Sequence, residues 1–127
     1  MTVRVLVVDD HRGTADSIAA ALADLGCSVL VVLNGAEALS QAQEFMPELI
    51  LLDLVLPDTD GYTIARSIRS SPWGRDVTLV AVTGMGQEED KSKSIEAGFD
   101  RHLMKPVQFS ELEELVDIRT FLRSIGR

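Results

Sequence analysis

The charged residues with the clearest potential for chemistry follow directly after apolar runs. Asp9 and Asp10 follow VRVLVV, Asp53 follows ELILL, and Lys105 follows RHLM. Three carboxylates brought together would repel one another by roughly 1 kcal/mol per pair at about 4 Å in water, and by about 4 kcal/mol at an effective dielectric near 20. A divalent cation and a lysine would remove that cost. These residue types therefore indicate a charged pocket that binds a metal ion.

Magnesium is the ion that fits these ligands best. Mg²⁺ is octahedral, is usually held by one or two carboxylates, keeps several waters, and completes its shell with a phosphoryl oxygen. A calcium loop is not predicted, because the chain has no run of alternating acidic ligands that ends in Glu. Zinc is not predicted either, because His11 and His102 have no partnering cysteine and no helical His spacing.

Asp53 is the candidate nucleophile. It lies between Leu52 and Leu54, at the end of an apolar strand, where an Asp carboxylate can attack phosphorus. A phosphoryl group on Asp53 would add about −1.5 to −2 charges and three acceptor oxygens. The Thr83 hydroxyl, which ends the run VTLVAVT, and the Lys105 ammonium could bind those oxygens. Phosphorylation would then pull on two loops.

Each of these residues taken alone has an ordinary structural explanation. An Asp after a strand is usually a helix cap or a turn residue. A Thr at a strand end is usually structural, and a Lys is most often simply solvated. Only their combination on successive strands favours a functional site.

Apolar runs alternate with helical patterns along the whole chain. Strands are predicted near 3–8, 28–32, 48–52, 77–82 and 100–104, and helices near 14–25, 35–45, 87–97 and 108–124. A further helix, between the loop after Asp53 and the break at 70–74, is predicted to carry Ile64, Ala65 and Ile68. This alternation is typical of βαβ units. The runs VRVLVV, LILL and VTLVAV are continuously apolar, which indicates strands buried on both faces. The sequence predicts an α/β fold, a parallel sheet between helices, with ligands at the carboxyl ends of its strands.

Three packing expectations follow from the same patterns. The last helix carries a broad apolar face, most of which should pack on the sheet: Leu112, Leu115, Val116, Ile118, Phe121, Leu122 and Ile125. The helix near 87–97 has only Ile95 and Ala97 as clearly apolar residues, so we expect it to be held loosely. The single cysteine, Cys27, cannot form an internal disulfide and is expected in the core.

Composition restricts the class of protein. A chain of 127 residues fits one domain, and its net charge of −8 argues against direct nucleic-acid binding, which relies on clustered Lys and Arg. The chain has no apolar run of the roughly 20 residues that a membrane helix needs, and no export signal is visible. We therefore expect a soluble, cytoplasmic, single-domain protein without a membrane partner.

With these motifs in place, the sequence resembles the receiver domains of two-component response regulators over nearly all of residues 3–124. The resemblance rests on VLVVDDH, on LLDLVLPDTDGY around Asp53, on AVTG, on EAGFD and on HLMKP. It implies a flavodoxin-like (βα)5 fold and Mg²⁺-dependent phosphorylation of Asp53 by a histidine kinase or a histidine phosphotransfer protein. The segments RHLMKPV and TGMGQEED look more like receivers of hybrid histidine kinases than like those of DNA-binding regulators. A single-domain regulator without an output domain is the other form considered.

The resemblance also implies roles for single residues. Asp10 would ligate Mg²⁺ directly, Asp9 directly or through water, Asp53 through its carboxylate, and Val55 through its backbone carbonyl. Thr83 would be the switch hydroxyl, Lys105 would pair with the phosphoryl oxygens, and the Lys105–Pro106 bond would be cis.

His102 departs from the pattern of the family. Many members carry Tyr or Phe three residues before the lysine, and that ring rotates inward on activation. For His102 three roles remain open: a smaller switch, a surface residue in contact with a partner, or a pH-sensitive group. The expected output surface is the face formed by residues 87–124, where a downstream protein would bind.

Two other functions compete with the phosphoacceptor. An aspartyl-phosphate phosphatase would typically carry a second Asp two residues after the nucleophile, but Val55 stands there and no insertion is long enough for a capping domain. A pseudo-receiver scaffold would bind partners without phosphorylation, which would leave the full set of Asp, Thr and Lys residues unexplained. Apart from slow self-phosphorylation and dephosphorylation, enzyme activity is not expected.

Overall fold

The protein is built on one five-stranded parallel sheet. The computed structural model describes residues 2–84 and 91–127. The strand order is β2-β1-β3-β4-β5, and every neighbouring pair is parallel. The strands are β1 (Arg4–Val8), β2 (Ser28–Val32), β3 (Leu49–Asp53), β4 (Thr78–Thr83) and β5 (Arg101–Met104). The predicted α/β class and the five parallel strands are therefore confirmed.

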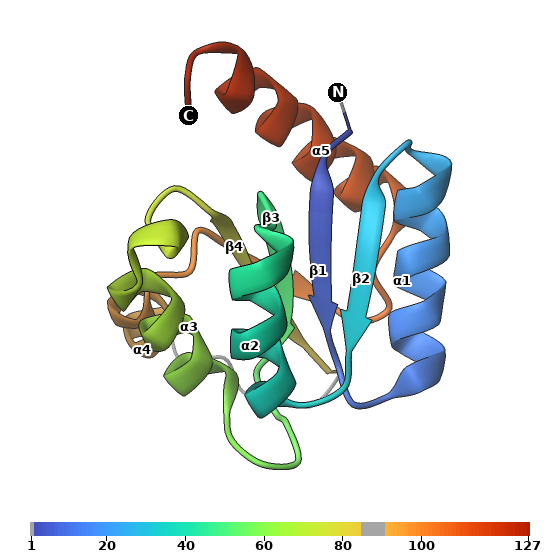
Figure 1. Cartoon of the computed structure of the whole chain (residues 1–127). Helices are drawn as coiled ribbons and strands as arrows, with labels where there is room; N and C mark the ends of the chain where they lie inside the picture. Colours follow the sequence, from blue (N-terminus) through green and yellow to red (C-terminus); the bar gives the residue numbers. More distant parts are fainter. Residues whose placement is uncertain (1, 85–90) are drawn as a thin grey trace.

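Helices cover both faces of this sheet (Figure 1). They are α1 (Arg12–Asp24), α2 (Gly35–Phe45), α3 (Gly61–Ser70), α4 (Lys91–Ala97) and α5 (Phe109–Ser124), with a short 3-10 turn, η1 (Pro72–Gly74). Side chains of α1 and α5 share one core layer, and side chains of α2, α3 and α4 share the other. This arrangement is the doubly wound form expected of alternating strands and helices.

The central strand β3 shows why continuous apolar runs form this sheet. Ile50 and Leu52 face the α2–α3 layer, whereas Leu49 and Leu51 face the α1–α5 layer. All four are at most 1% exposed. Complete burial of each such side chain contributes roughly 1.5–3 kcal/mol. Asp53 is carried by the same strand to the edge of the sheet, at the end of a rigid and buried element.

The apolar face of α5 is narrower than expected. Leu112, Leu115 and Val116 are buried, but Phe121 is 61% exposed and Ile125 is 55% exposed. The next buried position along this face is taken by a charged residue, Arg119. The buried stripe of α5 therefore ends in Arg119, and Phe121 lies on the opposite, exposed side of the helix.

Other sequence expectations need smaller corrections. Cys27 is only half-buried, at the turn into β2, where burial raises the pKa of its thiol and the negative charge of Glu48 adds to that shift. On α4 Ile95 is exposed, and Ser94 and Ala97 are buried. Residues 87–90 of the predicted fourth helix lie outside the described residues.

Residues 2–84 and 91–127 contain no helix that is both long enough and apolar enough to cross a membrane.

Candidate functional site

The predicted site residues meet at the carboxyl ends of the strands. Asp9 follows β1, Asp53 ends β3, Thr83 ends β4, and Lys105 follows β5. Asp53 pairs in register with Val82, one residue before Thr83. Because all strands run the same way, these ends lie along one edge of the sheet. The topology therefore gathers residues that are far apart in the sequence.

Asp53 is fixed by two hydrogen bonds at the floor of this site. Its side chain is almost fully buried, Oδ1 accepts the N–H of Val55 at 2.9 Å, and Oδ2 accepts the ammonium of Lys105 at 3.0 Å. A buried carboxylate needs such partners to remain charged. The two bonds hold the carboxylate in one orientation at the strand end.

Lys105 joins the two buried carboxylates. Its Nζ lies 2.8 Å from Asp9 Oδ2 and 3.0 Å from Asp53 Oδ2. The other oxygen of Asp9, Oδ1, accepts the N–H of His11 at 2.9 Å. Asp9 Oδ2 accepts no hydrogen bond from the described residues. Its contact with Lys105 is therefore an ion pair. One lysine thus faces two buried negative charges.

The charge balance appears in the pKa values. Burial raises the pKa of Asp53, the nearby charge of Asp9 adds to the rise, and the bonds from Val55 and Lys105 offset only part of it. Burial alone would lower the pKa of Lys105, but contact with Asp9 and Asp53 outweighs it and raises that pKa. Lys105 is therefore held as a cation, while the carboxylates still lack positive charge.

This donor set fits a hard divalent cation. Asp9, Asp10 and Asp53 each offer a carboxylate oxygen, and the three oxygens lie within 4.8 Å of one another. Asp10 is exposed, whereas Asp9 Oδ2 is buried and accepts no hydrogen bond from the described residues. An orphaned oxygen beside a water-accessible carboxylate suits Mg²⁺, which takes carboxylate oxygens and retains waters. The residues therefore fit the metal that the sequence predicts.

Thr83 and the cis peptide lie beside the same site. Thr83 is buried at the end of β4, and its carbonyl accepts the backbone N–H of Lys105 at 2.8 Å. The Lys105–Pro106 peptide bond is cis. The backbone bond ties the end of β4 to the residue that carries the ammonium group.

His102 contacts the neighbouring helix α4. It is half-buried on β5, one of its ring nitrogens, Nε2, lies 2.7 Å from the hydroxyl of Ser94 on α4, and its ring packs at 6.0 Å from that of Phe99. Since Ser94 is buried, this contact is part of the packing between α4 and β5. A role in switching stays a prediction.

Two residues next to the site have structural roles that the sequence reading missed. His11 is the N-cap of α1, where its Nδ1 accepts the N–H of Thr14 at 3.1 Å. Asp58 accepts the N–H groups of Gly35 and Ala36 at 2.9 and 3.0 Å, which lowers the pKa of its carboxyl. Asp58 follows Pro57 in a turn-like run, but nothing in its local sequence points to residues 22 and 23 positions away.

The family model described as the response regulator receiver domain matches residues 5–117. The chain therefore belongs to the receiver-domain family of response regulators. It is 37% identical over 112 residues to an uncharacterized 14.6 kDa protein of Leptolyngbya boryana, covering 88% of this chain and 86% of that one. It is 32% identical over 124 residues to the DNA-binding regulator RpaA of Synechocystis, covering 98% of this chain but only 51% of RpaA.

Solved structures show the same fold. A CheY-like receiver domain protein from Methanospirillum hungatei superposes with a TM-score of 0.88 at 27% identity, covering all of both chains. The receiver domain of the sensor histidine kinase PA1611 from Pseudomonas aeruginosa gives a TM-score of 0.83 at 31% identity, covering 93% of this chain and 97% of that one. That structure holds a magnesium ion in its active-site cleft. The relatives thus include both a kinase receiver and a DNA-binding regulator.

Proposed function

We propose that this chain is a phosphoacceptor of two-component signalling and that Asp53 receives the phosphoryl group. The observation that supports this most directly is the position of the Asp53 carboxylate, which is buried, oriented by Val55 N–H, and 3.0 Å from the Lys105 ammonium. An oriented carboxylate beside a fixed cation suits in-line attack on phosphorus. The proposed donor is a phosphohistidine of a histidine kinase or of a histidine phosphotransfer protein.

The transfer balances without another reactant. A carboxylate oxygen of Asp53 forms the new O–P bond as the N–P bond of the phosphohistidine breaks, and the electron pair of that bond returns to the imidazole. Lys105 is close enough to the acceptor oxygen to balance the charge that the phosphoryl group adds. Thr83, buried at the neighbouring strand end, is the proposed second contact of the phosphoryl oxygens.

Mg²⁺ would be held by Asp9, Asp10 and Asp53, with the backbone carbonyl of Val55 as the fourth proposed ligand from the chain. When bound, the ion supplies positive charge that neutralises the carboxylates and the phosphoryl oxygens. Asp9 Oδ2 accepts no hydrogen bond from the described residues, which supports its use as a metal ligand.

The proposed output is a change in the surface of residues 87–124. The carbonyl of Thr83 accepts the backbone N–H of Lys105, and His102 on β5 contacts Ser94 on α4. These two contacts connect the site to that surface. A downstream protein would bind there, residues 1–127 would act as one receiver domain, and the cytoplasm is the expected location.

Intact mass after incubation with acetyl phosphate tests the proposal. We expect the wild type to gain one phosphoryl group only when Mg²⁺ is present, and Asp53→Asn to gain none. Asp16→Asn removes an exposed carboxylate on α1 and is the matched control, which should label like the wild type. Labelling of Asp53→Asn, or labelling without Mg²⁺, would contradict the proposed acceptor.

A wild type that accepts no label is tested next with a phosphorylated histidine phosphotransfer protein. Transfer from that donor would keep Asp53 as acceptor, whereas failure with both donors would support the pseudo-receiver scaffold. Neither result depends on the surface that the phosphorylated chain presents.

A further inference from the structure

A second charged cavity lies at the opposite edge of the sheet, where strands β4 and β5 begin. Its volume is about 220 Å³. It is lined by five of the nine arginines in the chain: Arg69, Arg75, Arg101, Arg119 and Arg127. Its acidic lining residues are Asp76 and Asp100. In a chain with a net charge of −8, this is a local excess of positive charge.

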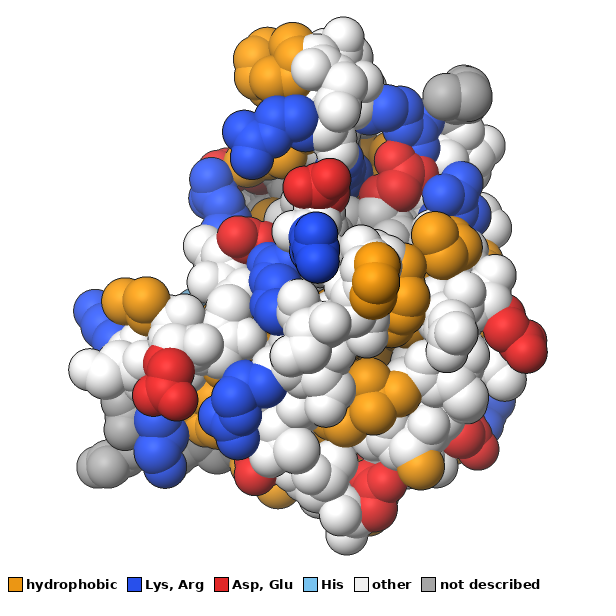
Figure 2. All heavy atoms as spheres, turned by 60° about the vertical axis from the view of Figure 1, so that its left-hand side comes forward, with side chains coloured by type: hydrophobic (Ala, Val, Ile, Leu, Met, Phe, Trp, Pro, Cys, Tyr) orange, Lys and Arg blue, Asp and Glu red, His pale blue; other side chains and the backbone are white. Residues whose placement is uncertain are grey.

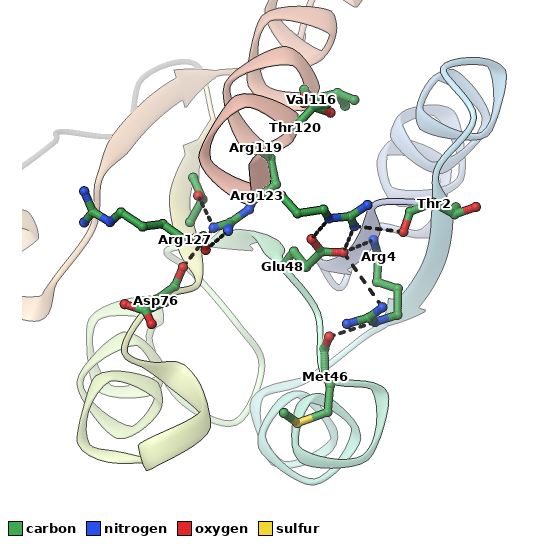
Figure 3. Close-up of polar contacts among 11 residues, drawn as sticks. Thr2, Arg4, Met46, Glu48, Asp76, Val116, Arg119, Thr120, Arg123 and Arg127 are labelled. Carbon is green, nitrogen blue, oxygen red and sulfur yellow. Dashed lines mark hydrogen bonds and ion pairs between the residues drawn. The ribbon is translucent and has the colours of Figure 1, made fainter. Parts of the chain in front are cut away.

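Arg119 distinguishes this cavity from an ordinary solvated basic surface, because its side chain is buried. It is 4% exposed, and its Nη1 donates to the carbonyl of Asp76 at 2.9 Å and to the Thr78 hydroxyl at 3.3 Å. Its Nη2 donates to the main-chain oxygen of Arg127, and its Nε has no hydrogen-bond partner among the described residues. Figure 3 shows the guanidinium between these groups. Among the described residues no Asp or Glu side chain pairs with this buried guanidinium, and one of its N–H groups is left without an acceptor.

The carboxylates near Arg119 are committed to other partners or lie at the surface. Glu48, which lines an adjoining cavity with Arg119, is paired with Arg123 and Arg4. Asp100 accepts the guanidinium of Arg69 at 2.9 Å and the N–H of Leu79 at 2.8 Å. A buried charge is costly unless it is paired. The cavity can therefore take an anion beside Arg119, where no Asp or Glu side chain of the described residues forms an ion pair.

The remaining arginines supply donors at the rim. Arg75 and Arg127 are exposed, and neither side chain forms a hydrogen bond or an ion pair with the part of the chain that the structure describes. Arg101 donates only to the exposed Glu114, at 3.3 Å. Figure 2 shows basic side chains gathered in the upper part of the face where α5 ends and β4 and β5 begin. Guanidinium groups match the oxygens of phosphate through paired hydrogen bonds.

We propose that this cavity is a binding site for a compact oxyanion of the phosphate type, either inorganic phosphate or the phosphate group of a small metabolite. The volume is below the roughly 300–1,000 Å³ of drug-sized pockets, which favours a small anion. Arg119 forms the floor of the site, and Arg75 and Arg127 close over the ligand. The site is separate from Asp53, so its occupation does not require phosphorylation.

Titration of the full chain with inorganic phosphate tests the site. The readout is the NMR signals of the Arg119 Nε–H and of the Asp76 and Thr78 amides, measured without Mg²⁺ at constant ionic strength. We expect saturable shifts at these groups. Shifts that chloride reproduces, or shifts confined to the neighbourhood of Lys105, would overturn the proposal.

Exposed variants locate the ligand without threatening the fold. Arg75→Gln and Arg127→Gln should each weaken phosphate binding roughly threefold, the size expected for one exposed charge pair. Arg66→Gln, which removes an exposed arginine of α3 outside the cavity, should bind as the wild type does. Equal affinity of all three variants would show that Arg75 and Arg127 hold no phosphate and that the proposed site does not exist.

The result is independent of the proposed phosphoacceptor. Asp53→Asn should bind phosphate at the arginine cavity with unchanged affinity, whether or not the wild type accepts a phosphoryl group. The source of the anion is resolved by competition, because a phosphorylated metabolite that displaces inorganic phosphate at lower concentration identifies the larger ligand.

Discussion

The two edges of the sheet hold opposite kinds of charge. At the carboxyl edge one lysine, Lys105, lies between two buried aspartates, with exposed Asp10 beside them. At the amino edge the buried Arg119 donates to the Asp76 carbonyl, the Thr78 hydroxyl and the main-chain oxygen of Arg127, and Glu48 meets two arginines. Carboxylates therefore outnumber cationic side chains at the first edge, whereas arginines outnumber carboxylates at the second.

The direction of the helices explains part of this difference. In a parallel α/β fold the helices begin at the carboxyl edge and end at the amino edge. Helix N-termini favour negative groups and helix C-termini favour positive groups. Asp9 precedes α1 by a few residues, while Arg119 and Arg123 lie in the last turns of α5. One fold can therefore hold two charged sites of opposite sign without bringing them into contact.

The largest expected effect comes from removing the cation of the acidic edge. Lys105→Met leaves Asp9 and Asp53 buried without their ion-pair partner, and breaking such a pair costs about 3 kcal/mol. Urea unfolding without Mg²⁺ measures this loss, and added Mg²⁺ should restore part of it. Lys91→Met, which changes an exposed lysine, is the control. A loss no larger than in the control would mean that the carboxylates do not need Lys105.

A substitution at the amino edge should lower the free energy of unfolding by less, and by the same amount with and without Mg²⁺. Glu48→Gln removes the charge that Arg123 and Arg4 share, at a cost of about 1 kcal/mol after solvent screening. Burial would raise the pKa of Glu48, but the contacts with Arg123 and Arg4 outweigh it and lower that pKa. This stabilisation is present above the unfolded value of 4.5 and is lost as pH falls through the folded value. Urea unfolding measured across this pH range should therefore show a free energy of unfolding that depends less on pH in Glu48→Gln than in the wild type. A loss of stability that depends on Mg²⁺ would contradict the contrast between the two edges.

The smallest effect is expected to have the opposite sign. Because burial raises the pKa of Asp53, its folded carboxyl binds a proton more readily than the unfolded one, so stability falls as pH rises from 3.8 through the folded value. Asp53→Asn removes that charge and should stabilise the Mg²⁺-free protein by less than about 1 kcal/mol at neutral pH. Thermal unfolding with and without Mg²⁺ provides the measurement. A destabilised variant would show that the bond from Lys105 outweighs burial and repulsion.

Much of the acidic edge could be predicted from the sequence because each of its residues ends an apolar strand. Asp9, Asp53, Thr83 and Lys105 lie where continuous apolar runs stop, and a parallel sheet brings such ends together. The element boundaries differ from the predicted ones by one or two residues at most of the described ends, as in α1, which begins at Arg12 because His11 caps it.

The arginine cavity could not be predicted, because its residues share no pattern along the chain. Arg119 lies in a helix whose apolar spacing predicts a different buried face, and its partners belong to the turn before β4, to β4 itself and to the segment after α5. Phe121 is exposed for the same reason, since the helix orients its stripe around Arg119. Contacts of this kind depend on how the helix is rotated, which periodicity does not fix.

The carboxylate of Asp58 joins the loop after Asp53 to the start of α2 through hydrogen bonds. Its two oxygens hold the amides of Gly35 and Ala36, although these residues precede it by more than twenty positions. Those amides exchange with solvent only when this contact opens. In a hydrogen-exchange experiment, two protons at the beginning of a distant helix would therefore report how often the loop after Asp53 leaves its place.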